Sequence, residues 1–89
     1  MRYLLKVPFE VSAPLSESDP DVRSIARLPG FVRLEQVDRD NSRYELTVEI
    51  EGGSRRDAMD AADELLVDYE SALGAYRPRL LAGLAPEPE

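Results

Sequence analysis

The chain has 89 residues, with 11 basic and 18 acidic side chains and a formal net charge of −7. A chain of this length forms one domain with a single modest core. It contains neither cysteine nor histidine, which excludes disulfides, thiolate metal sites and a Ser-His-Asp triad, and removes the usual general base at neutral pH. We therefore expect a protein that is not an enzyme and holds no cofactor.

The acidic excess lies in the second half of the chain. Residues 1–37 carry five basic and five acidic side chains, whereas residues 38–89 carry six and thirteen. Acidic surfaces repel phosphate backbones, so we expect no nucleic-acid partner. No segment approaches the roughly 18 apolar residues of a membrane span, and the first apolar run is too short for a signal peptide. We expect no membrane partner and a cytoplasmic location.

The first predicted strand covers residues 2–11, where apolar and polar side chains alternate. The face predicted to be buried consists of Tyr3, Leu5, Val7, Phe9 and Val11. Pro8 interrupts the pattern because proline has no backbone N–H to donate to a ladder. We therefore expect a bulge near Pro8.

A short helix and a strand pair are predicted next. Ser18 or Asp19 before Pro20 is typical of a helix start, and Pro29 ends the helix. A strand follows over residues 31–37, with Phe31 on the face opposite Val32 and Leu34. Residues 38–42 form a turn, and a strand over residues 43–51 completes a hairpin.

A second helix is predicted over residues 55–73. Ser54 with Asp57 three residues later is similar to a capping box, and Gly74 stands where a left-handed C-terminal cap belongs. Apolar residues recur at helical spacing at Met59, Ala62, Leu66, Tyr69 and Leu73. We expect this stripe, with Leu66 buried, to pack on the apolar face of the sheet.

Residues 75–84 are predicted to form a last strand. This strand should lie at a sheet edge, because Pro78 has no backbone N–H to donate to a second neighbour. The order strand, helix, strand, strand, helix, strand predicts the α+β class and a ferredoxin-like βαββαβ sandwich, an antiparallel sheet with two helices on one face. This single domain covers residues 1–84. Residues 85–89 are predicted to be a disordered tail.

Two segments are similar to the frame of heavy-metal-associated domains. They are Leu28-Pro-Gly-Phe-Val32 and Ala72-Leu-Gly-Ala-Tyr-Arg-Pro-Arg-Leu80. The resemblance implies the ferredoxin-like fold over about residues 20–81. That family binds metal through a Cys-x-x-Cys loop, and the corresponding residues 8–20 contain no cysteine or methionine. Metal transfer is therefore not implied.

Short matches at Asp19-Pro20, Gly30-Phe31 and Glu45-Leu46 resemble the small PurS subunit of bacterial purine biosynthesis. The basic, glycine-containing segment between the second and third strands of that family is replaced here by residues 38–42. The resemblance implies the fold only, and a fold does not define a function.

Acidic residues follow one side of the second predicted helix, at Asp57, Asp60, Glu64 and Asp68, with Asp63 and Glu70 nearby. Carboxylates at this spacing are able to bind a hard cation. No glycine-bearing ligand loop accompanies them, so we interpret the row as a solvated helix face and predict no metal site. A basic partner remains an alternative for this face.

Gly53, Ser54, Arg55 and Arg56 are the candidate ligand-binding residues. Free N–H groups at a helix start attract anions, and two arginines add positive charge. The competing interpretation is a plain connection between strand and helix. Tyr44, Tyr69 and Tyr76 are interpreted as core packing rather than an aromatic ligand box.

The leading functional hypothesis is a small binding or assembly module that acts through a protein partner or as a homo-oligomer. The sequence shows no catalytic signature, and only carboxylates, tyrosines, arginines, serines and Lys6 are available as catalytic groups, so an enzyme is the third and least favoured hypothesis. A small domain with two edge strands, in contrast, has surface for pairing. The alternative is a regulatory domain that binds a small anionic metabolite at residues 53–56. Stacking of two sheets is disfavoured, because the second sheet face is strongly charged.

Overall fold

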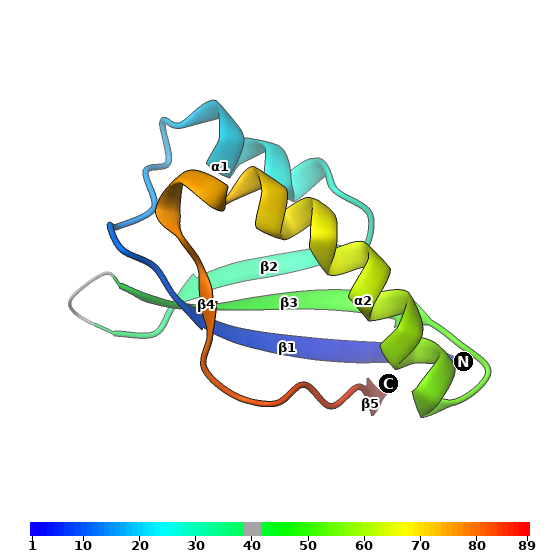
Figure 1. Ribbon diagram of the computed structural model, residues 1–89. Helices are drawn as coiled ribbons and strands as arrows, with labels where there is room; N and C mark the ends of the chain where they lie inside the picture. Colours follow the sequence, from blue (N-terminus) through cyan, green and yellow to red (C-terminus); the bar gives the residue numbers. More distant parts are fainter. Residues whose placement is uncertain (39–41) are drawn as a thin grey trace.

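The computed structural model describes residues 1–38 and 42–89 and has an α+β architecture (Figure 1). Its elements in chain order are β1 (Arg2–Glu10), α1 (Pro20–Ser24), a 3₁₀ turn (Ile25–Arg27), β2 (Phe31–Gln36), β3 (Arg43–Glu51), α2 (Arg55–Ala72), a second 3₁₀ turn (Gly74–Tyr76), β4 (Arg79–Leu80) and β5 (Glu87–Pro88). The antiparallel sheet has the order β2-β3-β1-β4, and β5 also pairs with β1. Both helices cover one face of this sheet. Within the described ranges, neither helix combines the length and apolar content that crossing a bilayer requires.

The α+β class, with two helices and an antiparallel sheet, is confirmed, but the end of the chain departs from the predicted βαββαβ order. The single last strand predicted over residues 75–84 is replaced by a 3₁₀ turn and by β4 and β5, each two residues long. Residues 85–89, predicted to be a disordered tail, instead return along β1, where Glu87 pairs with Leu4. The predicted turn at residues 38–42 lies partly outside the described residues.

Pro8 accounts for the division of the last strand. β1 pairs with β3 continuously from Arg2 to Glu10, so the predicted bulge near Pro8 is wrong. On its other edge, the Pro8 carbonyl accepts a hydrogen bond from the Leu81 backbone N–H at 3.0 Å. A regular antiparallel pair returns a second bond, and proline has no N–H to make it. The β4 ladder therefore ends at this pair, and β1 gains its next partner only at β5.

The core lies between the sheet and the helices. Its buried side chains are Tyr3, Leu5, Val7, Phe9, Val11, Val22, Ile25, Tyr44, Leu46, Val48, Ile50, Ala58, Ala62, Tyr69 and Leu73. The predicted stripe on α2 is confirmed in part, because Leu66 is half-buried rather than buried. The helix approaches the sheet over Ala58 and Ala62, which turns Leu66 towards one flank.

A register shift between Phe31 and Arg33 alters the predicted face of β2. Because of this bulge, Phe31 and Leu34 both pack against the core, while Val32 is 46% exposed. The strict alternation expected over residues 31–37, with Phe31 facing away from Leu34, is therefore wrong. Insertion of one extra residue moves every preceding side chain to the other face.

Both helices begin at their predicted N-caps, but the left-handed residue after α2 is not the predicted one. Asp19 caps α1 by accepting a hydrogen bond from the Asp21 backbone N–H at 2.9 Å. The C-terminal residue with left-handed geometry is Arg77, at φ 51°, and not Gly74. The chain continues through a 3₁₀ turn after α2, so the reversal that requires positive φ comes three residues later than predicted.

Candidate functional site

The four residues of the predicted anion site lie together at the start of α2. The Ser54 hydroxyl accepts a hydrogen bond from the Asp57 backbone N–H at 3.2 Å, which confirms Ser54 as the N-cap. A Cβ atom placed on Gly53 would lie 3.2 Å from Asp57 Oδ2, so this carboxylate folds back over the helix start. Asp57 thus already supplies negative charge at the positive end of the helix dipole. Anion binding at Gly53, Ser54, Arg55 and Arg56 stays a prediction.

The acidic row on α2 is solvent-exposed along its length. Asp57, Asp60, Glu64 and Asp68 are all exposed. In the part of the chain that the structure describes, no three acidic side chains converge closely enough to hold a metal ion. The row therefore provides negative surface charge rather than a built ligand set.

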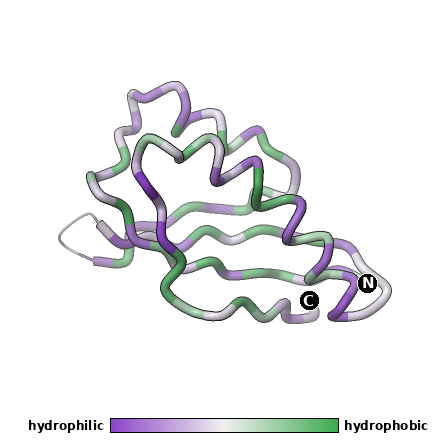
Figure 2. The backbone as a smooth tube through the Cα atoms, viewed as in Figure 1, coloured by the Kyte–Doolittle hydropathy of each residue, from purple (hydrophilic) through white to green (hydrophobic). Residues whose placement is uncertain are grey.

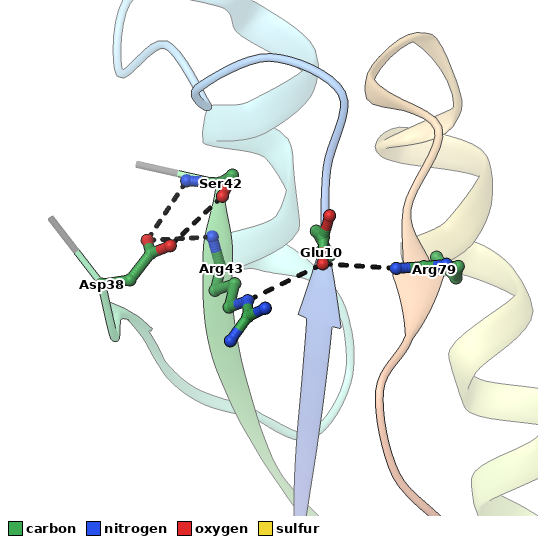
Figure 3. A network of polar contacts seen from close by, with 5 residues as sticks. All are labelled: Glu10, Asp38, Ser42, Arg43 and Arg79. Carbon is green, nitrogen blue, oxygen red and sulfur yellow. Dashed lines mark hydrogen bonds and ion pairs between the residues drawn. The ribbon is translucent and has the colours of Figure 1, made fainter. Parts of the chain in front are cut away.

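Ion pairs lie on the open face of the sheet, and Figure 3 shows the network around Glu10. Glu10 lies between two arginines, with Oε2 3.7 Å from Arg43 and 3.3 Å from Arg79. Arg2 is 3.7 Å from Glu49 and 3.5 Å from Glu51. Exposed pairs of this kind contribute little stability. They set opposite charges beside one another on this face.

Hydrogen bonds occupy the tyrosine hydroxyls proposed as an alternative ligand box. The Tyr44 hydroxyl accepts from the Leu15 N–H at 3.1 Å, and the Tyr76 hydroxyl donates to Asp19 at 2.6 Å. The second bond lowers the pKa of Asp19 and raises the pKa of Tyr76. Since Tyr44 and Tyr69 are buried in the core, these rings support the fold rather than a ligand.

An apolar groove of about 230 Å³ lies between α2 and the segment around β4. Its floor is the helix-facing side of the sheet, at Val7, Phe9 and Leu46. One wall is α2, at Leu66, Val67 and Leu73, and the other is formed by Pro78, Leu80 and Leu84. Figure 2 shows that the stretch of chain directly after β4 is largely apolar.

The walls of the groove leave apolar side chains in contact with solvent. Val67 is 56% exposed and Leu80 is 50% exposed, and the adjacent Leu81 is 39% exposed. The groove lies over the part of β1 whose outer neighbour is the short β4. The hydrogen-bond ladder between β1 and β4 stops at Pro8 and Leu81. No continuous strand therefore runs along this edge of β1 in the described residues.

Two carboxylates stand at the rim of the groove. Asp63 and Glu70 both line it, and they precede and follow Val67 by four and three residues. Side chains at these spacings share one side of a helix. Among the ion pairs of the described residues, none involves Asp63 or Glu70. The groove therefore combines an apolar interior with negative charge that the fold leaves unneutralised.

Tyr69 closes the deep side of the groove. Its hydroxyl donates a hydrogen bond to the Pro29 carbonyl at 2.9 Å. Burial, with a smaller contribution from the charge of Asp68, raises the pKa of Tyr69 to about 12. The hydroxyl stays protonated at neutral pH and ties α2 to the loop before β2.

Sequence reasoning missed the groove as a site. It noted Asp63 and Glu70 only as neighbours of the acidic row and did not consider Val67 between them. A valine among acidic residues on the outer side of a helix is the signal in the sequence, and the pair Leu80-Leu81 beyond the helix is the second. Their proximity depends on how the last segment returns to the sheet.

The fold and the groove define a small α+β domain with an apolar groove on its surface. The sequence matches no family model, and no curated protein or solved structure shows significant similarity to the chain. The resemblances to heavy-metal-associated domains and to the small PurS subunit thus rest on the quoted residues alone.

Proposed function

We propose that the protein is a non-catalytic binding module whose site is the apolar groove beside α2. The observation that carries this proposal is the exposure of Val67 and Leu80 on opposite walls of one hollow. Single exposed apolar residues are common on soluble proteins. Apolar surface gathered in one place and rimmed by polar groups is typical of an interaction site.

The sheet edges are less suited to binding than the groove. At one edge, β2 carries a bulge, and Arg33 and Glu35 form an ion pair at 3.2 Å. At the other edge, β4 and β5 have two residues each. Bulges, charges and short strands are the features that discourage edge pairing. They favour a partner that docks side chains over one that adds a strand.

The chemistry of the groove supports a binding role rather than a catalytic one. Its ionisable groups are Asp63, Tyr69 and Glu70, and the Tyr69 hydroxyl is held by the Pro29 carbonyl. The sequence has no histidine or cysteine to serve as base or nucleophile.

The same proposal assigns the domain to the ferredoxin-like βαββαβ class, with β4 and β5 together in the position of the last strand. The strand order β2-β3-β1-β4 and the two helices on one face support this assignment. The divided last strand then has a function in this chain, since it leaves the groove open.

Affinity capture with matched variants tests the binding role. Val67→Glu places a charge in the groove, and Val32→Glu makes the same change at an exposed valine on β2, outside it. We expect a partner that the wild type and Val32→Glu retain and Val67→Glu loses, and that binds the purified wild type in calorimetry. A partner lost equally by both variants, or none that depends on Val67, would contradict the proposal.

A further inference from the structure

We propose that the groove receives an amphipathic helix of a partner protein, which carries one large apolar side chain between two basic residues. This inference rests on the proposed function and adds the chemistry of the partner. The apolar side chain enters the groove beside Val67, and the basic residues pair with Asp63 and Glu70.

The size and lining of the groove favour a single side chain as the inserted group. Its volume of about 230 Å³ is below the roughly 300–1,000 Å³ of typical small-molecule sites. The interior offers few polar groups to orient a metabolite, because the Tyr69 hydroxyl already donates to Pro29. A leucine, methionine or phenylalanine presented by a macromolecule needs no such groups.

The spacing of the two carboxylates selects a helix over a strand. Asp63 and Glu70 are seven residues apart on α2, which corresponds to about 10 Å along the axis. A helix packed alongside α2 repeats its side chains at the same spacing and places two basic residues on one side. A strand covers about 10 Å in three residues, and side chains three apart on a strand point to opposite faces.

Charge argues against a second copy of the chain as the occupant. Each copy carries a net charge of −7. A symmetric contact through the groove would bring the acidic rims of two molecules together, and like charges facing one another destabilise an interface. A basic helix reverses the sign of this interaction.

Fluorescence anisotropy with synthetic helices provides the test. The probe is an alanine-based helical peptide of about 18 residues with one leucine bracketed by two lysines seven residues apart. One control peptide replaces both lysines with glutamate, and another replaces the leucine with alanine. We expect the lysine-leucine peptide to bind at least about tenfold more tightly than either control.

Two matched double variants distinguish the effect of the groove-rim carboxylates on peptide binding from the effect of negative charge elsewhere on α2. Asp63→Asn with Glu70→Gln neutralises the rim, and Asp68→Asn with Glu64→Gln removes the same charges from the same helix outside the groove. The first pair should weaken binding of the lysine-leucine peptide about tenfold, and the second less than about twofold. Circular dichroism of both variants checks that the fold is retained.

Several results would overturn the inference. They are equal weakening by both double variants, equal binding of the three peptides, no binding of the lysine-leucine peptide, and a dimer in sedimentation velocity that Val67→Glu dissolves. A captured partner that depends on Val67 but not on Asp63 and Glu70 would leave the proposed function standing and remove only this inference. Loss of any dependence on Val67 would remove both.

Discussion

Helix α2 packs on the sheet differently along its two flanks. Towards β2 the contact is closed: a Cβ atom on Gly30 would lie 3.2 Å from the Leu65 side chain of α2, and the Tyr69 hydroxyl of α2 donates to the Pro29 carbonyl at 2.9 Å. Towards β4 the contact is open, with the apolar groove of about 230 Å³ between helix and chain. The side of α2 that faces β2 is therefore closely packed, whereas the side that faces β4 leaves apolar side chains exposed.

The difference shows how a local backbone irregularity leaves apolar surface exposed. On the β2 side, a glycine allows backbone and side chains to approach closely. On the β4 side, Pro8 ends a hydrogen-bond ladder after one bond to Leu81. Where regular structure stops, apolar side chains that a full-length strand would cover remain accessible.

The largest expected effect comes from truncating the buried end of α2. Leu73 is 3% exposed, so Leu73→Ala should lower the free energy of unfolding by about 2–5 kcal/mol. Leu66 is half-buried on the open flank, and Leu66→Ala should cost only about 1–2 kcal/mol. Urea denaturation of both variants measures the difference. Equal losses would mean that Leu66 is as deeply buried as Leu73, although both residues line the groove.

Gly30→Ala tests the closed flank. Gly30 has φ +79°, and an added Cβ would lie 2.7 Å from the Glu49 carbonyl oxygen. Left-handed geometry and overpacking together should lower the free energy of unfolding by about 2–4 kcal/mol. Gly74→Ala is the control, because no atom lies within 4 Å of its added Cβ; it should be neutral or stabilise by up to about 1 kcal/mol. If thermal melts show that Gly30→Ala is as stable as the wild type, the packing around Gly30 is looser than described.

Tyr69→Phe tests the hydrogen bond between α2 and the loop before β2, and the pH dependence of its stability tests the burial of the Tyr69 hydroxyl. Loss of the hydrogen bond to Pro29 should cost about 1–2 kcal/mol at neutral pH. The pKa of Tyr69 is raised in the folded state from 10.0 to about 12, so its contribution is complete below pH 10 and is lost as the pH rises towards 12. Denaturation at pH 8, 10 and 11.5 should show a shallower alkaline decline in Tyr69→Phe than in the wild type. Identical declines would mean that Tyr69 is not buried as described.

The smallest effect concerns the turn that leads into β4. Arg77 has φ 51°, a conformation that costs an ordinary residue about 1–2 kcal/mol. Arg77→Gly should therefore raise the free energy of unfolding by about 0.5 kcal/mol after the entropy cost of glycine. Arg79→Gly removes the same charge within β4 and should lower it by a similar amount. If both glycine variants lose stability, the turn does not have the left-handed geometry described.

Local patterns predicted the elements that depend on neighbours in sequence. The bounds of β3, the N-caps at Asp19 and Ser54 and most of α2 follow from alternation, capping residues and helical spacing. These signals act over a few residues, so they survive in one sequence read alone. The α+β class follows from the order of the elements.

The failures lie where distant residues decide the structure. The bulge after Phe31 depends on pairing with β3, and the half-exposure of Leu66 depends on how closely two alanines approach the sheet. The groove depends on one missing hydrogen bond between Pro8 and Leu81, which are far apart in the sequence. The sequence alone places the effect of Pro8 on β1, whereas in the structure it falls on the strand that pairs with β1.

The most direct test of the groove as the binding site is an NMR titration of the isotope-labelled protein with the lysine-leucine peptide. We predict that backbone amide shifts concentrate in residues 63–70 of α2 and in residues 79–84, with Val67 and Leu80 among the largest. Arg33 and Glu35 on β2 and Arg2 on the open sheet face should not move. Shifts spread over the open face or centred on β2, with residues 63–70 unchanged, would contradict the account.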